Sequence, residues 1–233
     1  MSASVTITHE LVRRTVGRDN GLRRLLPTTY QYALFRSLAA VWPERNLRVL
    51  DVGCGAGRVA AGYIDLLNAS ITVGVDVANR FAPNRRIPCV QFDGVHLPFR
   101  SGAFDVVAMV NVLHHVPDRR RIALIAECVR VTGGGPIIVK DHVALRRSDY
   151  LRLAMLDVLG NLPAGGMVKA EYLTDGTMDQ LFASVGYSPF SKVGAEFRTG
   201  LLCLLFPNRL EQTVLFAPHA LTAHTIQWER WRA

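Results

Sequence analysis

Lysine is nearly absent from this sequence, although the chain is basic. Its 233 residues carry a formal net charge of +8, and the only lysines are Lys140, Lys169 and Lys192. The arginines stand in scattered groups of two and three, with few aromatic residues between them. This distribution is typical of a solvated surface. An anionic substrate or a lipid surface also fits it, and sequence-specific nucleic-acid binding fits it least.

Paired cysteines and long apolar runs are missing as well. Cys54, Cys89, Cys128 and Cys203 form no Cys-x-x-Cys pair, so their spacing indicates neither a zinc site nor a disulfide framework. We predict buried thiols in a reducing compartment and no metal. No apolar run approaches the roughly 18 residues of a membrane helix. The first residues contain no apolar signal segment, so we expect a cytoplasmic protein, monomeric or homodimeric, without stable membrane insertion.

Strand and helix patterns alternate from residue 48 onward. Helical spacing is present at 57–67 and 118–131, the second with Asp118 as its expected cap and an apolar face of Ile122, Ile125, Ala126 and Val129. Short apolar runs typical of buried strands occur at 48–52, 71–76, 89–93, 104–112 and 136–140. Repeated strand–helix units of this length predict an α/β fold with a mostly parallel sheet covered on both faces. Ligands of such sheets bind outside the carboxyl ends of the strands.

The two ends of the chain follow other patterns. Residues 8–43 have helical spacing, with Thr28 and Thr29 as capping residues. Helices are also expected at 146–160 and at 171–185, ending at Gly186, with a loop at 160–166. Beyond them lie strand-like segments at 188–193 and 220–228, and an apolar stretch at 201–206.

A glycine-rich turn follows the first predicted strand in "LDVGCGAGR". Gly53, Gly55 and Gly57 let the backbone turn sharply and approach a ligand where a Cβ would collide. The dinucleotide fingerprint would need glycine where Arg58 stands. A purely structural turn would explain this loop equally well if it stood alone.

Acidic residues at successive strand ends strengthen the interpretation that the glycine-rich turn binds a ligand. Asp51 ends the first strand, Asp76 the second and Asp93 the third. An acid at the position of Asp76 can accept both hydroxyls of a ribose. Three acids without a phosphate-binding Lys-Ser/Thr pair fit a nucleoside that lacks phosphates and carries positive charge. S-adenosylmethionine is such a ligand.

The combination "VLDVGCGAGR…VGVDV…FDGVHLPFRSGAFDVVAMVNVLHHV" resembles the class I S-adenosylmethionine-dependent methyltransferases, in particular the type 11 branch. The resemblance covers residues 47 to about 142. It implies a Rossmann-like, doubly wound, mostly parallel seven-stranded sheet at 47–233, with a helical N-terminal cap at 1–46 and a substrate lid at 146–172. It also implies that Asp76 holds the ribose, Asp93 the adenine amino group, and Asp51 the methionine amino group through water or backbone. The full set of implied cofactor-binding residues is Asp51, Gly53, Cys54, Gly55, Gly57, Asp76, Val77, Asp93, Gly94, Asn111 and Val112.

Candidates for a catalytic base follow the fourth and fifth strands. The fifth runs without a break into Lys140, Asp141 and His142, which is either a return to solvent or the floor of an active site. We predict the second, with His142 as base and Asp141 fixing its tautomer or acting itself, while Lys140 reaches the surface. His115 in "LHHV" is a further catalytic candidate, and its neighbour His114 is another; a structural role explains either.

Substrate contacts are expected from the lid and the N-terminal helices. Asn161 and Tyr172 are the predicted lid contacts, and Tyr30 is the predicted contact from the N-terminal wall. Asp157 is a third polar residue of the lid, for which simple packing of a helix and its loop is the favoured explanation.

The expected function is methyl transfer to a small-molecule acceptor, a secondary metabolite or a lipid-like compound. Three alternatives stay open. The same cofactor site could serve non-methylating chemistry, such as cyclisation of the cofactor's own side chain. A non-catalytic cofactor-binding protein would retain the fold. RNA methylation would draw on the basic charge, but "NVLHHV" stands where an Asn-Pro-Pro-Tyr motif would be expected.

Overall fold

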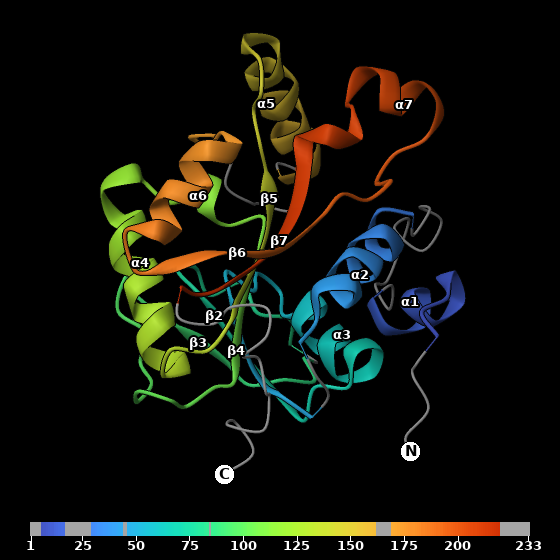
Figure 1. Ribbon diagram of the computed structural model, residues 1–233. Helices are drawn as coiled ribbons and strands as arrows, with labels where there is room; N and C mark the ends of the chain where they lie inside the picture. The colour runs from blue at the N-terminus through green and yellow to red at the C-terminus, as the bar shows by residue number, and fades with distance from the viewer. Residues whose placement is uncertain (1–5, 17–28, 44–45, 84, 162–168, 220–233) are drawn as a thin grey trace.

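The computed structural model describes residues 6–16, 29–43, 46–83, 85–161 and 169–219. A seven-stranded sheet in the order β3-β2-β1-β4-β5-β7-β6 forms its centre (Figure 1). Five strands pair in parallel, and β7 runs antiparallel to both β5 and β6. The strand order reverses beside β1, between β1 and β4, which is where open α/β sheets bind their ligands. The doubly wound, mostly parallel seven-stranded sheet is therefore confirmed.

The strands agree with the apolar runs in the first two thirds of the chain. They are β1 (Arg48–Val52), β2 (Ile71–Asp76), β3 (Cys89–Gln91), β4 (Val106–Val110), β5 (Ile137–His142), β6 (Tyr187–Val193) and β7 (Glu211–Pro218). The expected strand at 104–112 is shorter at both ends. The strand expected at 136–140 continues to His142, because β7 pairs with it as far as Glu211.

Helices connect the strands and cover the sheet. They are α1 (His9–Val16), α2 (Thr29–Val41), α3 (Arg58–Leu67), α4 (Asp118–Thr132), α5 (Arg147–Asn161), α6 (Asp175–Ala183) and α7 (Gly200–Leu205), with short 3-10 turns at Leu113–His115 (η2) and Asn208–Leu210 (η4). No helix in the described ranges is long and apolar enough to cross a membrane.

The two faces of the sheet carry two separate apolar cores. Leu50, Val107 and Val139 pack with α4 and α6. Their neighbours in sequence, such as Val49, Val106 and Ile138, pack with α1, α2 and α3 on the other face. Successive side chains of a strand point to opposite faces, so an uninterrupted apolar run is buried only when both faces are covered.

The N-terminal helices share a core with the rest of the molecule. Leu34, Phe35 and Leu38 of α2 lie in the same apolar cluster as Tyr63 of α3. The Phe35 ring packs directly over Gly62, where an added Cβ would come within 2.4 Å of it. The described residues before β1 therefore cover one face of the sheet and form no separate core. Thr28 lies outside the described residues, and α2 begins at Thr29.

The last described strand comes from a segment to which the sequence pattern assigned no structure. It is β7, formed by "EQTVLFAP" at Glu211–Pro218, whereas the strand expected at 220–228 lies outside the described residues. Residues 201–205 of the apolar stretch belong to the exposed helix α7, and Phe206 after it is buried. β7 is a central strand paired on both sides, so its position depends on its partners β5 and β6 and not on local alternation.

Two details of α4 also differ from expectation. Pro117 occupies the N-cap position, Asp118 is the first helical residue, and no side chain caps the helix. The buried face consists of Leu124, Ile125 and Cys128, while Ile122 and Ala126 are exposed. The apolar face is therefore rotated from the predicted one. Further on, the helix expected at 171–185 is shortened to Asp175–Ala183, and Leu173 instead bridges to Val143.

One buried acid, Asp149, fixes the start of α5 to the turn before β7. Its carboxylate accepts hydrogen bonds from the backbone N–H groups of Leu145 and Arg146 at 3.1 and 2.9 Å. The guanidinium of Arg209 donates to both of its oxygens at 2.6 and 2.7 Å. This bidentate pair lowers the pKa of Asp149 to about 2.

We predict that Asp149→Asn lowers the free energy of unfolding by about 2 kcal/mol at pH 7, because it removes the charge that Arg209 needs. The folded-state pKa lies below the unfolded one, so this contribution is present above about pH 4 and is lost as pH falls toward 2. Urea unfolding of both proteins at pH 7 and pH 3 measures it. Asp65→Asn, which removes an exposed pair with Arg86, serves as control and is expected to cost less than about 1 kcal/mol. An equal loss in both variants would contradict the prediction.

Candidate active site

A cavity of about 1500 Å³ opens at the carboxyl ends of β1, β2 and β4. Among the residues predicted to bind the cofactor, Gly57 alone is absent from its lining. Those that line it are Asp51, Gly53, Cys54, Gly55, Asp76, Val77, Asp93, Gly94, Asn111 and Val112. The structure therefore brings together residues that lie as much as 61 positions apart (112 − 51).

The glycine-rich turn is held in a conformation that favours glycine. Gly53, Gly55 and Gly57 have φ angles of 77°, 54° and 80°. A Cβ on Gly53 would lie 2.5 Å from Cγ2 of Val112, so the turn passes directly against that side chain. Gly57 stands at the N-cap of α3 and packs near Cys89, where a Cβ would lie 3.2 Å from the sulfur. The absence of a side chain at Gly57 therefore allows the start of α3 to pack against Cys89.

Asp76 links the glycine-rich turn to the end of β2. Its Oδ2 accepts a hydrogen bond from the Gly55 N–H at 2.8 Å, and its Oδ1 accepts one from the Ala78 N–H at 2.9 Å. A carboxylate has about four acceptor positions, so two backbone bonds leave capacity for further donors. The side chain is buried at the cavity wall and fixed in orientation before any ligand arrives.

Asp51 is a second buried acid on this wall. The Tyr63 hydroxyl donates to its Oδ1 at 3.0 Å. Burial raises the pKa of Asp51 to about 7, and the hydrogen bond from Tyr63 only partly offsets this. A positive charge placed beside it would favour its ionised form.

Asp93 is exposed and turned toward its own loop. Its carboxylate accepts from the N–H groups of Val95 and His96, at 2.8 and 2.7 Å, and contacts the His96 ring at 2.6 Å. The bond with His96, followed by those backbone bonds, lowers the pKa of Asp93. Its predicted adenine contact stays a prediction: Asp93 lines the cavity, but its oxygens are engaged by the loop.

Lys140 does not reach the surface, contrary to expectation. It is fully buried and pairs with the buried Glu211 of β7. Its Nζ also donates to the Tyr30 hydroxyl oxygen and to Asn111 Oδ1, both at 2.6 Å. Burial alone lowers the pKa of Lys140, but Glu211 reverses this and the net pKa lies above its usual value. The antiparallel pairing with β7 supplies the acid that makes burial of this ammonium tolerable.

The network ends at two residues that face the cavity. Asn111 has a φ of 56°, a left-handed conformation that asparagine tolerates, and donates to the Tyr30 hydroxyl oxygen at 3.1 Å. Tyr30 and Asn111 both line the cavity. Lys140, which does not line it, fixes the Tyr30 hydroxyl and the Asn111 amide by hydrogen bonds.

Asp141 and His142 are also buried, and neither belongs to the described lining of the cavity. The Asp141 carboxylate contacts Nδ1 of His114 and accepts from the N–H of Leu113 at 2.8 Å. The ring of His142 instead lies 3.2 Å from Glu211. The expectation that Asp141 fixes the His142 ring and that both face the substrate is therefore not met. Pairing with β7 has made this segment part of the sheet interior.

The histidine pair after β4, and not Asp141 and His142, faces the cavity. His114 and His115 both line it. Burial alone lowers the pKa of His114, but the adjacent Asp141 raises it to about 9. The ring of His115 donates through Nδ1 to the Lys169 carbonyl oxygen at 2.9 Å, since a carbonyl can only accept. Burial, followed by the charge of His114, lowers the pKa of His115.

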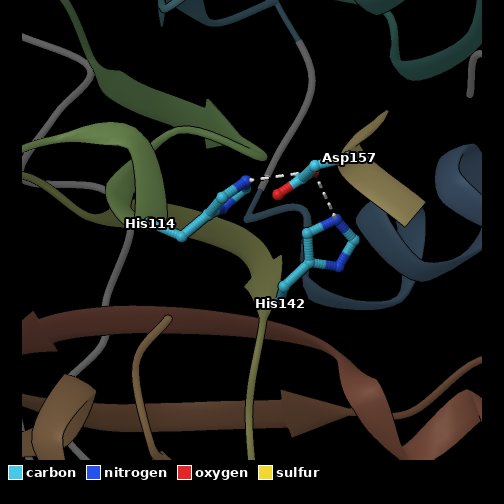
Figure 2. Close-up of side chains that lie close together, drawn as sticks. All are labelled: His114, His142 and Asp157. Carbon is cyan, nitrogen blue, oxygen red and sulfur yellow. Dashed lines mark ion pairs between the residues drawn. The ribbon is translucent and has the colours of Figure 1, made fainter. Parts of the chain in front are cut away.

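The segment predicted as a lid places Asp157 beside His114 and His142 (Figure 2). Asp157 projects from α5, and the Tyr172 hydroxyl donates to its Oδ2 at 2.5 Å. The Tyr172 ring stacks on that of His114, with 5.7 Å between centroids. Tyr172 is absent from the described lining, whereas Lys169, Ala170 and Glu171 belong to it. Asn161 is the last residue of α5, and its side chain lies outside the described residues.

Several residues of the site carry no sequence signal of their own. Glu211 pairs with Lys140, His142 and Arg198, yet it begins a strand that was not predicted. Arg119 and Arg120 line the cavity from the first turn of α4, in a run that read as solvated surface. Glu211 is the acid opposite the charged end of β5, but it can be recognised as such only when the pairing register of β5 and β7 is known.

Residues 50–139 match the family model described as "Methyltransferase domain". Over 96 residues the chain is 33% identical to a probable tRNA methyltransferase 9B of Homo sapiens, covering 39% of this chain. The chain spans only 20% of that relative's length. Over 175 residues it is 26% identical to a ubiquinone biosynthesis O-methyltransferase of Cereibacter sphaeroides, covering 70% of this chain and 68% of that protein.

The fold is also that of solved methyltransferase structures. A SAM-dependent methyltransferase from Thermotoga maritima superposes with a TM-score of 0.62 at 16% identity, covering 91% of this chain and all of that one. At this identity the likeness establishes the fold alone.

We predict that Gly53→Ala lowers the free energy of unfolding by about 2–4 kcal/mol, from the left-handed conformation and from overpacking against Val112. Gly102→Ala is the matched control: its φ is 67° but no atom lies within 4 Å of the added Cβ, so about 1 kcal/mol is expected. Adding Val112→Ala to Gly53→Ala is expected to recover part of the loss. Urea unfolding compares the four proteins, and equal losses for Gly53→Ala and Gly102→Ala would refute the role of the Val112 contact.

Proposed function

We propose that this chain is a class I S-adenosylmethionine-dependent methyltransferase of the type 11 branch and that it transfers a methyl group from S-adenosylmethionine to a small-molecule acceptor. The observation that carries the proposal is the pre-arranged wall of the cavity. The glycine-rich turn, Asp76 and Asp51 stand together at the carboxyl ends of β1 and β2.

The residues of this wall fit the cofactor. No atom lies within 4 Å of the place where a Cβ of Gly55 would stand, so the turn there admits the close approach of the cofactor's methionine part. The Asp76 carboxylate can accept further hydrogen bonds from the ribose hydroxyls. The ammonium group of the cofactor's methionine part would stabilise the ionised form of the buried Asp51. Asn111 and Val112 would contact the methionine side, with Val77, Asp93 and Gly94 toward the adenine.

The cavity has room for a second ligand. Small-molecule sites usually enclose about 300–1000 Å³, and this cavity is about 1500 Å³. Val16 and Tyr30 contribute to it from α1 and α2, and residues 169–171 from the opposite side. This arrangement supports the division into an N-terminal cap at 1–46 and a methyltransferase domain at 47–233 with a lid at 146–172.

His115 is the proposed base. When bound, the cofactor supplies an electrophilic methyl group on a sulfonium, so the chain's residues need only align the acceptor, exclude water and accept a proton. Because His115 donates through Nδ1 to Lys169, its Nε2 is the nitrogen that carries the lone pair in the neutral ring. Asp141 and His142 enter the proposal as positioning residues, and Tyr30 and Tyr172 as groups that shape the acceptor side.

The acceptor class is inferred from the lining and from one relative. Apolar residues such as Leu34, Phe92 and Val116 line the cavity together with Arg119 and Arg120. A largely apolar compound with an anionic group fits this combination. The similarity to a ubiquinone biosynthesis O-methyltransferase points the same way. Exposed leucines on α5 and α7, among them Leu151 and Leu204, would suit a lipid-like acceptor or its membrane surface.

RNA is the second candidate acceptor. The same arginines could contact phosphates, and the first of the relatives above is a probable tRNA methyltransferase. The small-molecule proposal is preferred because Arg119 and Arg120, although exposed, line the same cavity as apolar side chains such as Leu34. We place the protein in the cytoplasm as part of this proposal, since all four cysteines are free thiols.

We predict that S-adenosylhomocysteine binds one-to-one in a calorimetric titration and that Asp76→Asn weakens this binding about 10- to 100-fold. The reason is the loss of hydrogen bonds to a charged acceptor, each worth about 1.5–3 kcal/mol. Asp65→Asn on the outer side of α3 is the control and should bind normally. Absence of heat and of thermal stabilisation in the wild type would reject the cofactor site and favour a protein that does not use it.

We predict that His115→Gln slows methyl transfer to a hydroxyl acceptor by about 10²- to 10⁴-fold while S-adenosylhomocysteine binds unchanged. Mass spectrometry of products from a panel of phenols, quinols and lipid-like acids, with bulk tRNA alongside, supplies the readout. Asp65→Asn, which alters an exposed ion pair with Arg86 and does not touch the cavity, is the control. An unchanged rate in His115→Gln would remove it as base, methylated tRNA alone would establish the second candidate, and cofactor consumption without any acceptor would indicate the cyclisation alternative.

A further inference from the structure

Three buried side chains from three different elements converge beside the cavity (Figure 2). His114 comes from η2, His142 from the end of β5, and Asp157 from the middle of α5. One ligand-type atom from each lies within 4.8 Å of the others. The exposed fractions of the three residues are 1%, 5% and 4%, so this is no loose surface cluster.

The distances inside the cluster are too long for hydrogen bonds. His114 Nε2 lies 3.7 Å from Asp157 Oδ1, and His142 Nε2 lies 3.9 Å from the same oxygen. Among the described residues, His114 Nε2 is a buried nitrogen without a hydrogen-bond partner. A buried polar atom in that state calls for an explanation, and an unplaced ion is one of the usual ones.

Carboxylates also lie next to the second nitrogen of each histidine. Nδ1 of His114 is in contact with Asp141, and Nδ1 of His142 lies 3.2 Å from Glu211 Oε2 without forming a hydrogen bond to it. Asp157 accepts the Tyr172 hydroxyl on Oδ2, and its Oδ1 is the oxygen nearest both imidazoles. Histidines that bind metals almost always present their second nitrogen to a carboxylate or carbonyl in this manner, which fixes tautomer and orientation.

We propose that His114, His142 and Asp157 form a binding site for a divalent transition-metal ion of the zinc or iron class. Two histidines and one carboxylate are a known ligand set for such ions and leave at least one coordination position open. Asp141 and Glu211 are the outer carboxylates of the site. Because His114 also lines the cavity, an ion can enter from there.

Two of the three distances in the cluster need only a small contraction to hold an ion. Ligand nitrogen and oxygen atoms about 2.1 Å from a tetrahedral ion lie roughly 3.4 Å from one another. The two distances to Asp157 Oδ1 are 3.7 and 3.9 Å, so they have to shorten by about 0.3 and 0.5 Å. The two histidine nitrogens lie within 4.8 Å of each other and have to approach as well. Side-chain rotations of His142 and Asp157 can supply these movements.

A proton is the competing occupant of the same space. Asp141 and Asp157 lie on the two sides of the His114 ring and favour a positive charge there. A protonated His114 would satisfy them without an ion, but it would leave no role for the convergence of His142 on the same oxygen. The two occupants differ in whether added metal binds.

The test uses the full chain, freed of metal with a chelator and titrated with Zn²⁺ by calorimetry and with Co²⁺ by visible absorption. We expect one equivalent to bind, with a rise in melting temperature and the absorption of low-coordinate Co²⁺. The isosteric Asp157→Asn and the variant His142→Gln should each weaken Zn²⁺ binding at least 100-fold. Asp141→Asn, which alters only an outer carboxylate, should weaken it about 10- to 100-fold.

His96→Gln is the matched control, because it changes a histidine–aspartate pair on the surface and should leave metal binding intact. Binding of S-adenosylhomocysteine by each variant shows that the variant is folded and keeps the metal question separate from the proposed function. The proposal is overturned if the wild type binds neither ion at micromolar concentration. It is equally overturned if Asp157→Asn and His142→Gln bind as the wild type does, or if only His96→Gln loses binding.

Discussion

The ion pair between Lys140 and Glu211 is the contact on which the rest of the site depends. Neither group is exposed, and a single charge at that depth would be costly without its partner. The pair exists because β7 runs antiparallel to β5 and sets Glu211 opposite His142 in register. From this point the polar network extends to Tyr30 and Asn111 at the cavity.

The same strand pairing explains why a charged sequence is buried at the end of β5. Lys140 points toward α2 and the cofactor side, whereas Asp141 points toward η2 and holds His114. His142 returns to the side of Glu211. Alternation along one strand thus sends three ionisable groups to two faces, each toward partners of its own. The polar groups of the site and those of the sheet interior therefore form one continuous network. A substitution in either part alters the hydrogen bonds and ion pairs of the other.

The wall of the cavity, with the glycine-rich turn, Asp51 and Asp76, arises differently in the chain from the cluster of His114, His142 and Asp157. The wall is formed by strand ends and the loops that directly follow them, so each of its residues stands near a strand end. The cluster requires α5 to return over η2, and Asp149 with Arg209 holds the helix start that makes this return possible. Its three ligand atoms come from residues 28 and 15 positions apart (142 − 114 and 157 − 142), far from any short metal-binding motif.

By itself the sequence determined the alternation of strands and helices from residue 48 to 142, the glycine-rich turn and the acids at strand ends. These are local: φ above zero selects glycine, and apolar runs select buried strands. The tertiary structure alone decided the position of β7 and the burial of Lys140. It also decided that Asp141 pairs with His114 where His142 was expected, and that both histidines lie next to Asp157. Each of these depends on which distant segments pair, because the energy of a buried charge is set by its neighbours in space and not by its neighbours in sequence.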